Sequence, residues 1–370
     1  MKTLPSGRRA VLSFSLLLCT SLAVSAPAVP SVMLLFDPAG RADNAINQSA
    51  SDGLDRVVRD SGIAFGSNAV TGADDALAQI RDAAKSNSVV IAVGGVSVGA
   101  LTKIAKEFPN VKFIGVDSLP SGPNTAGLRF REHEGGFLAG AMAGKASSTQ
   151  ILGVVGAGND PVTTKYRAGF IAGVKFVCGN CTVLTANVTK PNDMFGATTL
   201  TKGLFAKGAD IVLAAAGSSS RGVVSAATSV ECLTAKTLPK GVTFKSDVFK
   251  AVPRSGTYKD SCKGDTRPVF AIGTESNMNR YGDTDIDPST LNHTLTSVIK
   301  RADNAVYAIL SDIAASRPWR PGERGFALQN GGIELSIDKT NRSLISPQME
   351  KDLTKIQKLV TDGVIKVPMQ

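Results

Sequence analysis

Short apolar runs alternate with amphipathic stretches over most of the chain. The apolar runs are rich in valine, isoleucine and leucine, which is typical of buried strands, and the stretches between them have the period of helices. A chain that alternates strand and helix favours parallel sheets covered by helices on both faces. We therefore predict strands over residues 32–36, 89–93, 111–117, 125–130, 151–155, 182–185, 211–215 and 269–272.

The strands and helices fall into two successive series. Each series covers about a hundred residues, so we expect two lobes of similar α/β architecture. Residues 331–336 are expected to form a turn and a further strand. The predicted helices cover residues 48–60, 73–85, 99–107, 163–176 and 193–207, a stretch after Ser220, a long stretch from the 269–272 strand to about residue 316, and 348–362.

A charged tetrad opens the most unusual helical stretch. Residues 131–134 read Arg-Glu-His-Glu, and residues 136–144 are rich in glycine and alanine. Such small residues indicate that the helix lies close against a neighbouring element. The tetrad follows the strand at 125–130, and ligands of open α/β sheets bind beside the carboxyl ends of strands. Successive helical residues point about 100° apart, so the tetrad is not expected to hold a metal ion.

The first 28 residues have the layout of an export signal. Three basic residues precede an apolar run over 10–24, and residues 26–28 read Ala-Pro-Ala. This order is typical of a signal peptide that is cleaved before Val29. We therefore assign residues 1–28 to a signal peptide and expect an exported protein that is periplasmic or associated with the cell envelope. Its net charge would be +7, because the chain carries +10 and the signal holds three basic residues and no acid.

Two alternatives remain open at this end of the chain. The first alternative is that Cys19 carries a lipid anchor, but bulky Leu18 stands where lipoprotein signals have a small residue. Arg8 and Arg9 would direct twin-arginine export. No later apolar run reaches the length of a membrane span, so we expect contact with the membrane only through a partner or such an anchor.

Composition narrows the function classes. Hydrophobic residues at 43% and charged residues at 19% fit a globular protein with a substantial core. Aromatic residues make up only 5%, and the basic residues are scattered along the chain. Both observations argue against a nucleic-acid partner. Two histidines without a nucleophile elbow give no legible catalytic set, so we predict that the protein is not an enzyme.

Four cysteines remain after the signal, and an exported chain favours disulfides. Of the three possible pairings we favour Cys178 with Cys181 and Cys232 with Cys262. A redox Cys-x-x-Cys is the alternative for the first pair, but Gly-Asn between its cysteines is typical of a turn. The polar residues 231–268 interrupt the strand–helix pattern, and we interpret them as an insertion held by the second disulfide.

Three loops that follow predicted strands are candidate ligand loops. The first covers residues 37–48, and plain capping of the next helix by Asn47 is an equal alternative. The second begins at Gly94. The third contains Gly217 and Ser218. Small residues there allow a ligand to approach the backbone, but no loop has a phosphate-binding or dinucleotide motif, so no cofactor is predicted.

In their order along the chain, these blocks resemble the basic membrane protein family of ABC-transporter substrate-binding proteins, also called the purine nucleoside receptor family. The resemblance covers nearly the whole chain after the signal. Its blocks are residues 43–48, 130–140, 156–173, 216–217, 272–276, 296–307 and 331–333.

The resemblance implies a type I periplasmic binding protein fold, with two doubly wound lobes joined by three crossings. We place the crossings near residues 126–129, 270–274 and 317–330. Glu132 and Glu134 are then expected to organise the first crossing rather than to do chemistry. The lobes would comprise residues 29–127 with 273–318, and residues 128–272 with 319–370.

The resemblance also implies a function: capture of a nucleoside, purine nucleosides favoured, and its delivery to an ABC permease by a monomeric protein. Another small polar ligand, or a sensor that signals to a membrane receptor, is the alternative. Ile46 stands where the family has an aromatic residue that stacks on the base. Together with the loop residues above, the expected ligand-binding set is Asp43, Asn47, Gly94, Asn159, Gly217, Ser218, Glu275 and Lys300.

Overall fold

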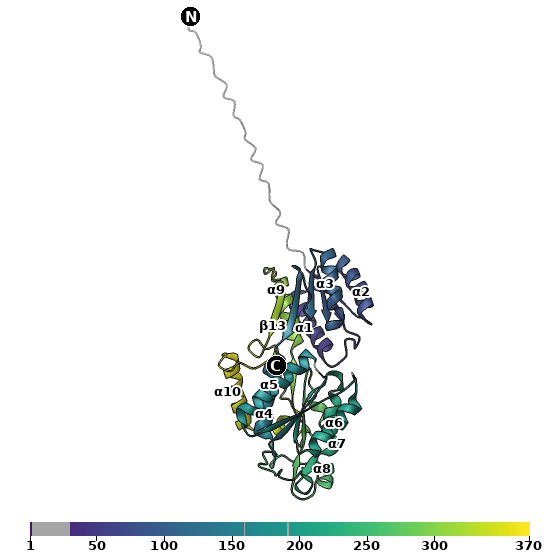
Figure 1. Ribbon diagram of the computed structural model, residues 1–370. Helices are drawn as coiled ribbons and strands as arrows, with labels where there is room; N and C mark the ends of the chain where they lie inside the picture. The colour runs from purple at the N-terminus through teal and green to yellow at the C-terminus, as the bar shows by residue number, and fades with distance from the viewer. Residues whose placement is uncertain (2–29, 159, 191) are drawn as a thin grey trace.

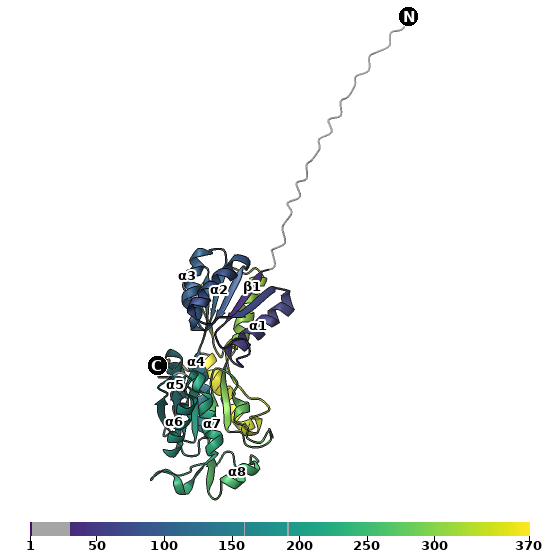
Figure 2. The same cartoon turned by 90° about the vertical axis from the view of Figure 1, so that its right-hand side faces the viewer.

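Two α/β lobes form the protein in the computed structural model, which describes residue 1 and residues 30–158, 160–190 and 192–370. The lobes lie end to end, and the chain enters at the far end of the first (Figure 1). Each lobe is built on a six-stranded sheet with helices on both sides (Figures 1 and 2). Apart from Met1, the predicted signal peptide lies outside the described residues.

The first lobe has a sheet in the order β13-β5-β4-β3-β1-β2, and all of its strand pairs are parallel. A short 3-10 helix, η1 (Gly95–Ser97), follows β3. The strands are β1 (Ser31–Phe36), β2 (Ala64–Ala69), β3 (Val89–Val93), β4 (Lys112–Val116), β5 (Thr125–Phe130) and β13 (Gly322–Phe326), and the helices are α1 (Ile46–Ser61), α2 (Ala73–Ser86), α3 (Val98–Glu107) and α9 (Ala302–Ala314).

The second lobe has a sheet in the order β14-β12-β11-β8-β6-β7, in which only the edge strand β14 is antiparallel to its neighbour. Its strands are β6 (Ile151–Gly156), β7 (Thr182–Asn187), β8 (Ile211–Ala215), β11 (Phe270–Gly273), β12 (Thr294–Lys300) and β14 (Ile333–Leu335). Its helices are α4 (Glu132–Ala146), α5 (Pro161–Val177), α6 (Met194–Ala206), α7 (Arg221–Val230) and α10 (Pro347–Thr361), with short turns η2 (Gly217–Ser219), η4 (Asn279–Tyr281) and η5 (Arg342–Leu344).

Helices α4 and α5 pack with their backbones in contact. A Cβ on Gly140 would overlap the carbonyl oxygen of Phe170, and one on Gly173 would overlap that of Phe137. The close neighbour predicted from the glycine-rich stretch is therefore confirmed, and it is α5. This contact places the first residues of both helices side by side at the edge of the lobe that faces the other lobe (Figure 1).

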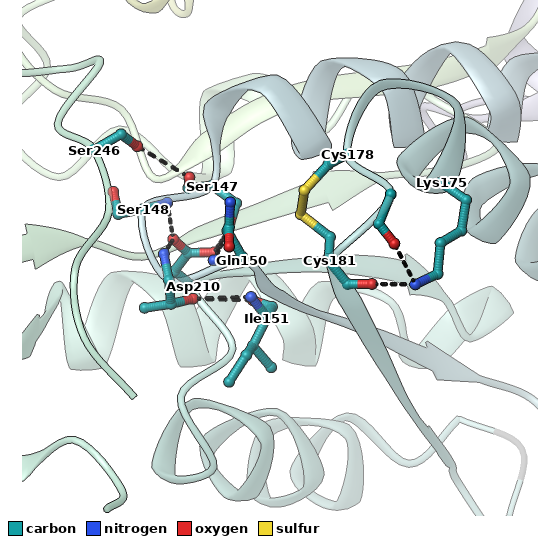
Figure 3. Close-up of a disulfide and its surroundings, with 11 residues drawn as sticks. Ser147, Ser148, Gln150, Ile151, Lys175, Cys178, Cys181, Asp210 and Ser246 are labelled. Carbon is teal, nitrogen blue, oxygen red and sulfur yellow. Dashed lines mark hydrogen bonds between the residues drawn. A yellow bond between two sulfur atoms is a disulfide. The ribbon is translucent and has the colours of Figure 1, made fainter. Parts of the chain in front are cut away.

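Both predicted disulfides are present. Cys178 and Cys181 close a turn at the end of α5, where the Lys175 ammonium also donates to the carbonyls of Gly179 and Cys181 (Figure 3). Cys232–Cys262 ties the ends of the insertion. The insertion contains an antiparallel pair of strands, β9 (Cys232–Thr234) and β10 (Thr266–Pro268), the turn η3 (Ala235–Thr237) and the short helix α8 (Gly256–Ser261).

The positions of the crossings differ from the sequence-based ones. The predicted helix up to residue 316 is wrong in its first part, because Thr294–Lys300 is rich in β-branched residues and forms strand β12 of the second sheet. The chain thus returns to the first lobe at Arg301, so residues 273–300 belong to the second lobe. Residues 319–326 belong to the first, since they lead into and form β13.

Strand β2 was not predicted. Its sequence, Ala-Phe-Gly-Ser-Asn-Ala, has no apolar run, because it lies at the edge of the sheet with most of its residues exposed. Within the described part of the chain, no helix combines the length and apolar character that crossing a bilayer requires.

Candidate functional site

A buried lysine lies between the lobes, surrounded by three carboxylates. Lys300 ends β12, and its side chain is 1% exposed. Its Nζ is 2.8 Å from Asp117 Oδ2, 3.1 Å from Glu132 Oε1 and 2.8 Å from Glu275 Oε2. We call these four residues the Lys300 cluster. Glu132 has a second ammonium partner, Lys165, at 2.9 Å from its Oε2.

The cluster draws its acids from both lobes. Asp117 follows β4 of the first lobe, whereas Glu275 follows β11 of the second and Glu132 begins α4. Asp117 and Glu275 have φ angles of 57° and 70°, a backbone region that residues other than glycine rarely adopt. Residues held in this region gather at active sites and ligand clamps. Because Asp117 and Glu275 follow β4 and β11, their side chains lie at the carboxyl edges of the two sheets.

For each charged group of the cluster, burial and the attraction of opposite charges shift the pKa in opposite directions. Burial would lower the pKa of Lys300, but Glu275, Asp117 and Glu132 outweigh it and hold the pKa well above its usual value. Burial would raise the pKa of Glu132, yet Lys300 and Lys165 lower it overall. For Glu275 burial wins over the attraction of Lys300, so its pKa is raised. The cluster thus keeps a permanently charged cation at the boundary between the lobes.

A cavity of about 270 Å³ opens beside the cluster. Tyr166, 1% exposed, contributes a hydroxyl without a hydrogen-bond partner among the described residues, and Glu275 Oε1 also lacks one there. These free polar atoms at the wall of a small cavity are suited to a polar ligand. The lining comprises Asp117 of the first lobe and, from the second, Asp160, Thr163, Tyr166, Gly217, Thr274, Glu275 and Lys300 among others.

A second cavity, of about 520 Å³, lies on the other side of Glu275 and Lys300. It too lies between the lobes, because residues from the start of α1 face a loop that contains Asp338. The Asp338 carboxylate accepts hydrogen bonds from Asn277 and Asn279, and these bonds, with those from Thr340, overcome burial and lower its pKa to about 2. Glu275 and Lys300 are therefore shared walls of two adjoining spaces.

The structure brings together only part of the sequence-predicted set. Glu275, Lys300 and Gly217 line the 270 Å³ cavity. Gly217 also lines a smaller neighbouring pocket of about 190 Å³, to which Ser218 contributes. Asn159 lies outside the described residues. The ligand-binding roles of these four residues and of Asn159 stay predictions. Gly217, Glu275 and Lys300 do, however, line the same cavity.

Asp43, Asn47 and Gly94 do not line either of the two larger cavities between the lobes. The Asp43 carboxylate accepts from three backbone amides at the start of α1. Asn47 is fully buried and donates to Asp37 Oδ1 and to the carbonyl of Gly40. These two residues therefore shape the 37–48 loop, as the alternative of turn chemistry expects. Capping by Asn47 is wrong, because Asn47 lies inside α1 after the N-cap residue Ala45, and the Asp43 carboxylate accepts from the first amides instead.

Sequence reasoning missed three residues of the cavity wall that carry ionisable side chains, Asp117, Asp160 and Tyr166. Asp117 could have been found, because it is an acid directly after a buried strand. Asp160 and Tyr166 belong to one of the blocks that carry the family resemblance. Asp160 also caps α5 by accepting from the amides of Val162 and Thr163. No local pattern showed that these side chains would face Lys300.

Two residues of the tetrad at 131–134, Arg131 and Glu134, organise the crossings, whereas the Glu132 carboxylate pairs with Lys300 and Lys165. The amide of Arg131 donates to the Phe326 carbonyl, and Glu134 Oε2 accepts from the amide of Leu328, so the first and third crossings are tied together. The buried His133 has a pKa lowered to about 4, first by burial and then by Arg131. No group of three potential ligand side chains among the described residues is arranged to hold a metal ion.

Two doubly wound lobes, three short crossings and a cavity between the lobes with charged side chains in its lining define a substrate-binding protein of the type I periplasmic binding fold. A solved solute-binding protein of an ABC transporter from Aeropyrum pernix has this fold, with a TM-score of 0.67 and 20% identity over 92% of this chain and 94% of its own. The chain belongs to the Bmp family of PnrA-like ABC transporter substrate-binding proteins, whose family model matches residues 30–232.

Curated relatives extend the similarity over most of the chain. The CD4+ T-cell-stimulating antigen of Listeria monocytogenes is 26% identical, covering 91% of this chain and 88% of the relative. The ABC transporter nucleoside-binding protein BmpA of Lactococcus lactis is 24% identical, covering 90% and 88%. Proteins of this family bind substrates for ABC transporters outside the cytoplasm and are not enzymes.

Proposed function

We propose that this protein captures a nucleoside between its lobes in the periplasm and delivers it to the permease of an ABC importer, with purine nucleosides favoured. The Lys300 cluster carries the proposal, because it joins both lobes at the wall of a cavity. Support also comes from the Lactococcus lactis relative, whose name specifies nucleoside binding. A signal peptide over residues 1–28 would supply the export step.

The polar groups of the cavity suit the sugar of a nucleoside. Ribose offers hydroxyls that both donate and accept hydrogen bonds. The carboxylates of Asp117 and Glu275 are acceptors, whereas the Lys300 ammonium and the Tyr166 hydroxyl are donors. Hydrogen bonds to charged groups are stronger than neutral ones, so the cluster would fix the sugar firmly.

The charge balance of the same cavity disfavours a phosphate. Four carboxylates line the cavity or belong to the Lys300 cluster, against two ammonium groups, both of which already pair with Glu132. A phosphate group would be repelled by these carboxylates. The repulsion would make the protein favour a nucleoside over the corresponding nucleoside monophosphate. The carboxylates are those of Asp117, Glu132, Asp160 and Glu275, and the ammonium groups those of Lys165 and Lys300.

Ligand capture would act on the crossings. Asp117 approaches Lys300 from the first lobe, and the remaining partners of Lys300 lie in the second. A ligand that bonds to groups on both sides of this boundary stabilises the arrangement in which the lobes are closed. The permease would then distinguish the ligand-bound protein from the ligand-free protein by its closed lobes.

Isothermal titration calorimetry tests the proposal with a panel of purine and pyrimidine nucleosides, free bases and nucleoside monophosphates. We expect at least one nucleoside to bind and its monophosphate to bind much more weakly. Tyr166→Phe is expected to weaken the binding of that nucleoside by about fivefold to thirtyfold, because it removes one donor from the cavity.

Tyr258→Phe is the matched control, because Tyr258 is also a buried tyrosine but lies in α8, outside the cavity lining. It should leave the affinity unchanged. Failure of every nucleoside to bind would refute the nucleoside assignment, and equal binding of a nucleoside and its monophosphate would refute the role given to the carboxylates.

A further inference from the structure

The insertion between the second lobe's α7 and β11 carries half of the chain's net charge of +10. We call residues 232–268 the tip segment. It contains six lysines and two arginines against three aspartates, a net charge of +5. Helix α8, which belongs to it, lies at the end of the second lobe opposite the first lobe in both views (Figures 1 and 2). The charge is therefore concentrated at one extremity of the molecule.

Two of the three aspartates of the tip segment pair with an arginine of the same segment. Asp247 and Asp265 both pair with Arg267, at 3.5 Å and 2.7 Å. The Arg254 guanidinium donates to the carbonyls of Phe249 and Val252. Asp260 is thus the only aspartate of the segment without an ion pair in the described part of the chain.

The lysines, by contrast, face solvent. All six are exposed, and none forms an ion pair with any residue in 30–158, 160–190 or 192–370. Val248, 48% exposed, lies in sequence between two of them and adds an apolar side chain to the basic surface. The six are Lys236, Lys240, Lys245, Lys250, Lys259 and Lys263.

The tip segment is held firmly against the lobe. The amide of Lys245 donates to the Ser148 carbonyl at 2.6 Å, and Ser246 Oγ donates to the Ser147 carbonyl at 3.1 Å. Asp210 in turn accepts from the 147–149 turn, so the segment is anchored to the start of β8 (Figure 3). With the Cys232–Cys262 disulfide, these bonds present the lysines from a fixed base.

We propose that the tip segment docks the protein on the surface of an anionic phospholipid membrane. Lysine is depleted at protein–protein interfaces, whereas clustered lysines are typical of segments attracted to anionic lipid headgroups. The aromatic side chains of the segment are buried or half-buried, so it lacks the exposed rings that stack on nucleic-acid bases. Attachment here leaves the cavities between the lobes free, and the proposal does not depend on which ligand they hold.

Vesicle co-sedimentation tests this proposal with the purified protein. We expect binding to vesicles of equal parts phosphatidylcholine and phosphatidylglycerol, no binding to phosphatidylcholine alone, and release as salt is added. Replacing the six tip lysines with glutamine should abolish binding, because each lysine that reaches the surface contributes about fivefold to the partition coefficient.

A matched variant replaces six exposed lysines outside the tip segment with glutamine, which gives the same net charge: Lys103, Lys106, Lys202, Lys351, Lys355 and Lys366. It should bind the anionic vesicles as the unchanged protein does. Circular dichroism melting checks that both variants fold. Equal loss in the two variants, or no preference of the unchanged protein for anionic vesicles, would overturn the proposal; the second result would leave an acidic protein as the fitting partner.

Discussion

Replacing Lys300 with methionine is expected to lower the free energy of unfolding by about 3 to 5 kcal/mol at neutral pH. The substitution removes the cation that three carboxylates share, while the side chain keeps a similar length. Three acids then remain near one another at the boundary between the lobes, and among the described residues only Glu132 retains an ammonium partner, Lys165. Urea unfolding followed by circular dichroism measures the loss.

The deficit should depend on pH in a defined direction. Without the ammonium, burial and mutual repulsion raise the pKa of the carboxyls in the folded state above their unfolded values. The folded state then binds protons more tightly, so the Lys300→Met variant regains stability as pH falls from about 7 to about 5. Adding Glu275→Gln to the variant should restore part of the loss at pH 7, because it removes one of the unpaired charges.

Lys339→Met is the control for this series. Lys339 lines the second cavity but is exposed and pairs with no acid in the described residues, so its loss should change stability by no more than about 0.5 kcal/mol. A Lys300→Met protein as stable as the unchanged one, or a deficit that does not vary with pH, would contradict the description of the cluster.

Gly140→Ala is expected to cost about 3 kcal/mol, although alanine ordinarily stabilises a helix. The added Cβ would overlap the Phe170 carbonyl oxygen and lie 2.9 Å from the Val174 nitrogen. Both neighbours are backbone atoms of α5, so no side chain can rotate away. The two helices would have to separate, and packing along their shared face would be lost.

Gly203→Ala provides the matched comparison. Gly203 is also a helical glycine of the second lobe, in α6, but a Cβ there meets nothing within 4 Å. This substitution should raise the free energy of unfolding by about 0.5 to 1 kcal/mol through helix propensity alone. If the two variants change stability in the same direction by similar amounts, the close contact between α4 and α5 is not what holds this lobe together.

The architecture was predictable because central parallel strands are buried on both faces and read as unbroken apolar runs. Strand β2 escaped prediction because it lies at a sheet edge, where exposure removes the apolar signal. Strand β12 was not predicted either, because α9 begins two residues after its end, so the predicted helix covered both elements. The error moved one crossing, since the sheet to which a strand belongs is set by long-range pairing.

The site was predictable only in part. Lys300 and Glu275 came from the family resemblance, whereas Glu132 was expected only to organise the first crossing. That these side chains meet Asp117 depends on how two lobes face each other, which no local pattern encodes. Asp43 and Asn47 show the converse, because polar residues on a loop after a strand equally suit turn and cap chemistry, and their hydrogen bonds serve the loop.

The most direct test of the account is a crystal structure of the protein with the nucleoside that binds it most tightly. We expect the nucleoside between the lobes, in the cavity lined by Tyr166, Glu275 and Lys300, with a sugar oxygen within hydrogen-bond distance of the Lys300 ammonium. A nucleoside bound elsewhere, for example in the pocket beside Trp319 in the first lobe, with the Lys300 cluster free of ligand contacts, would contradict it.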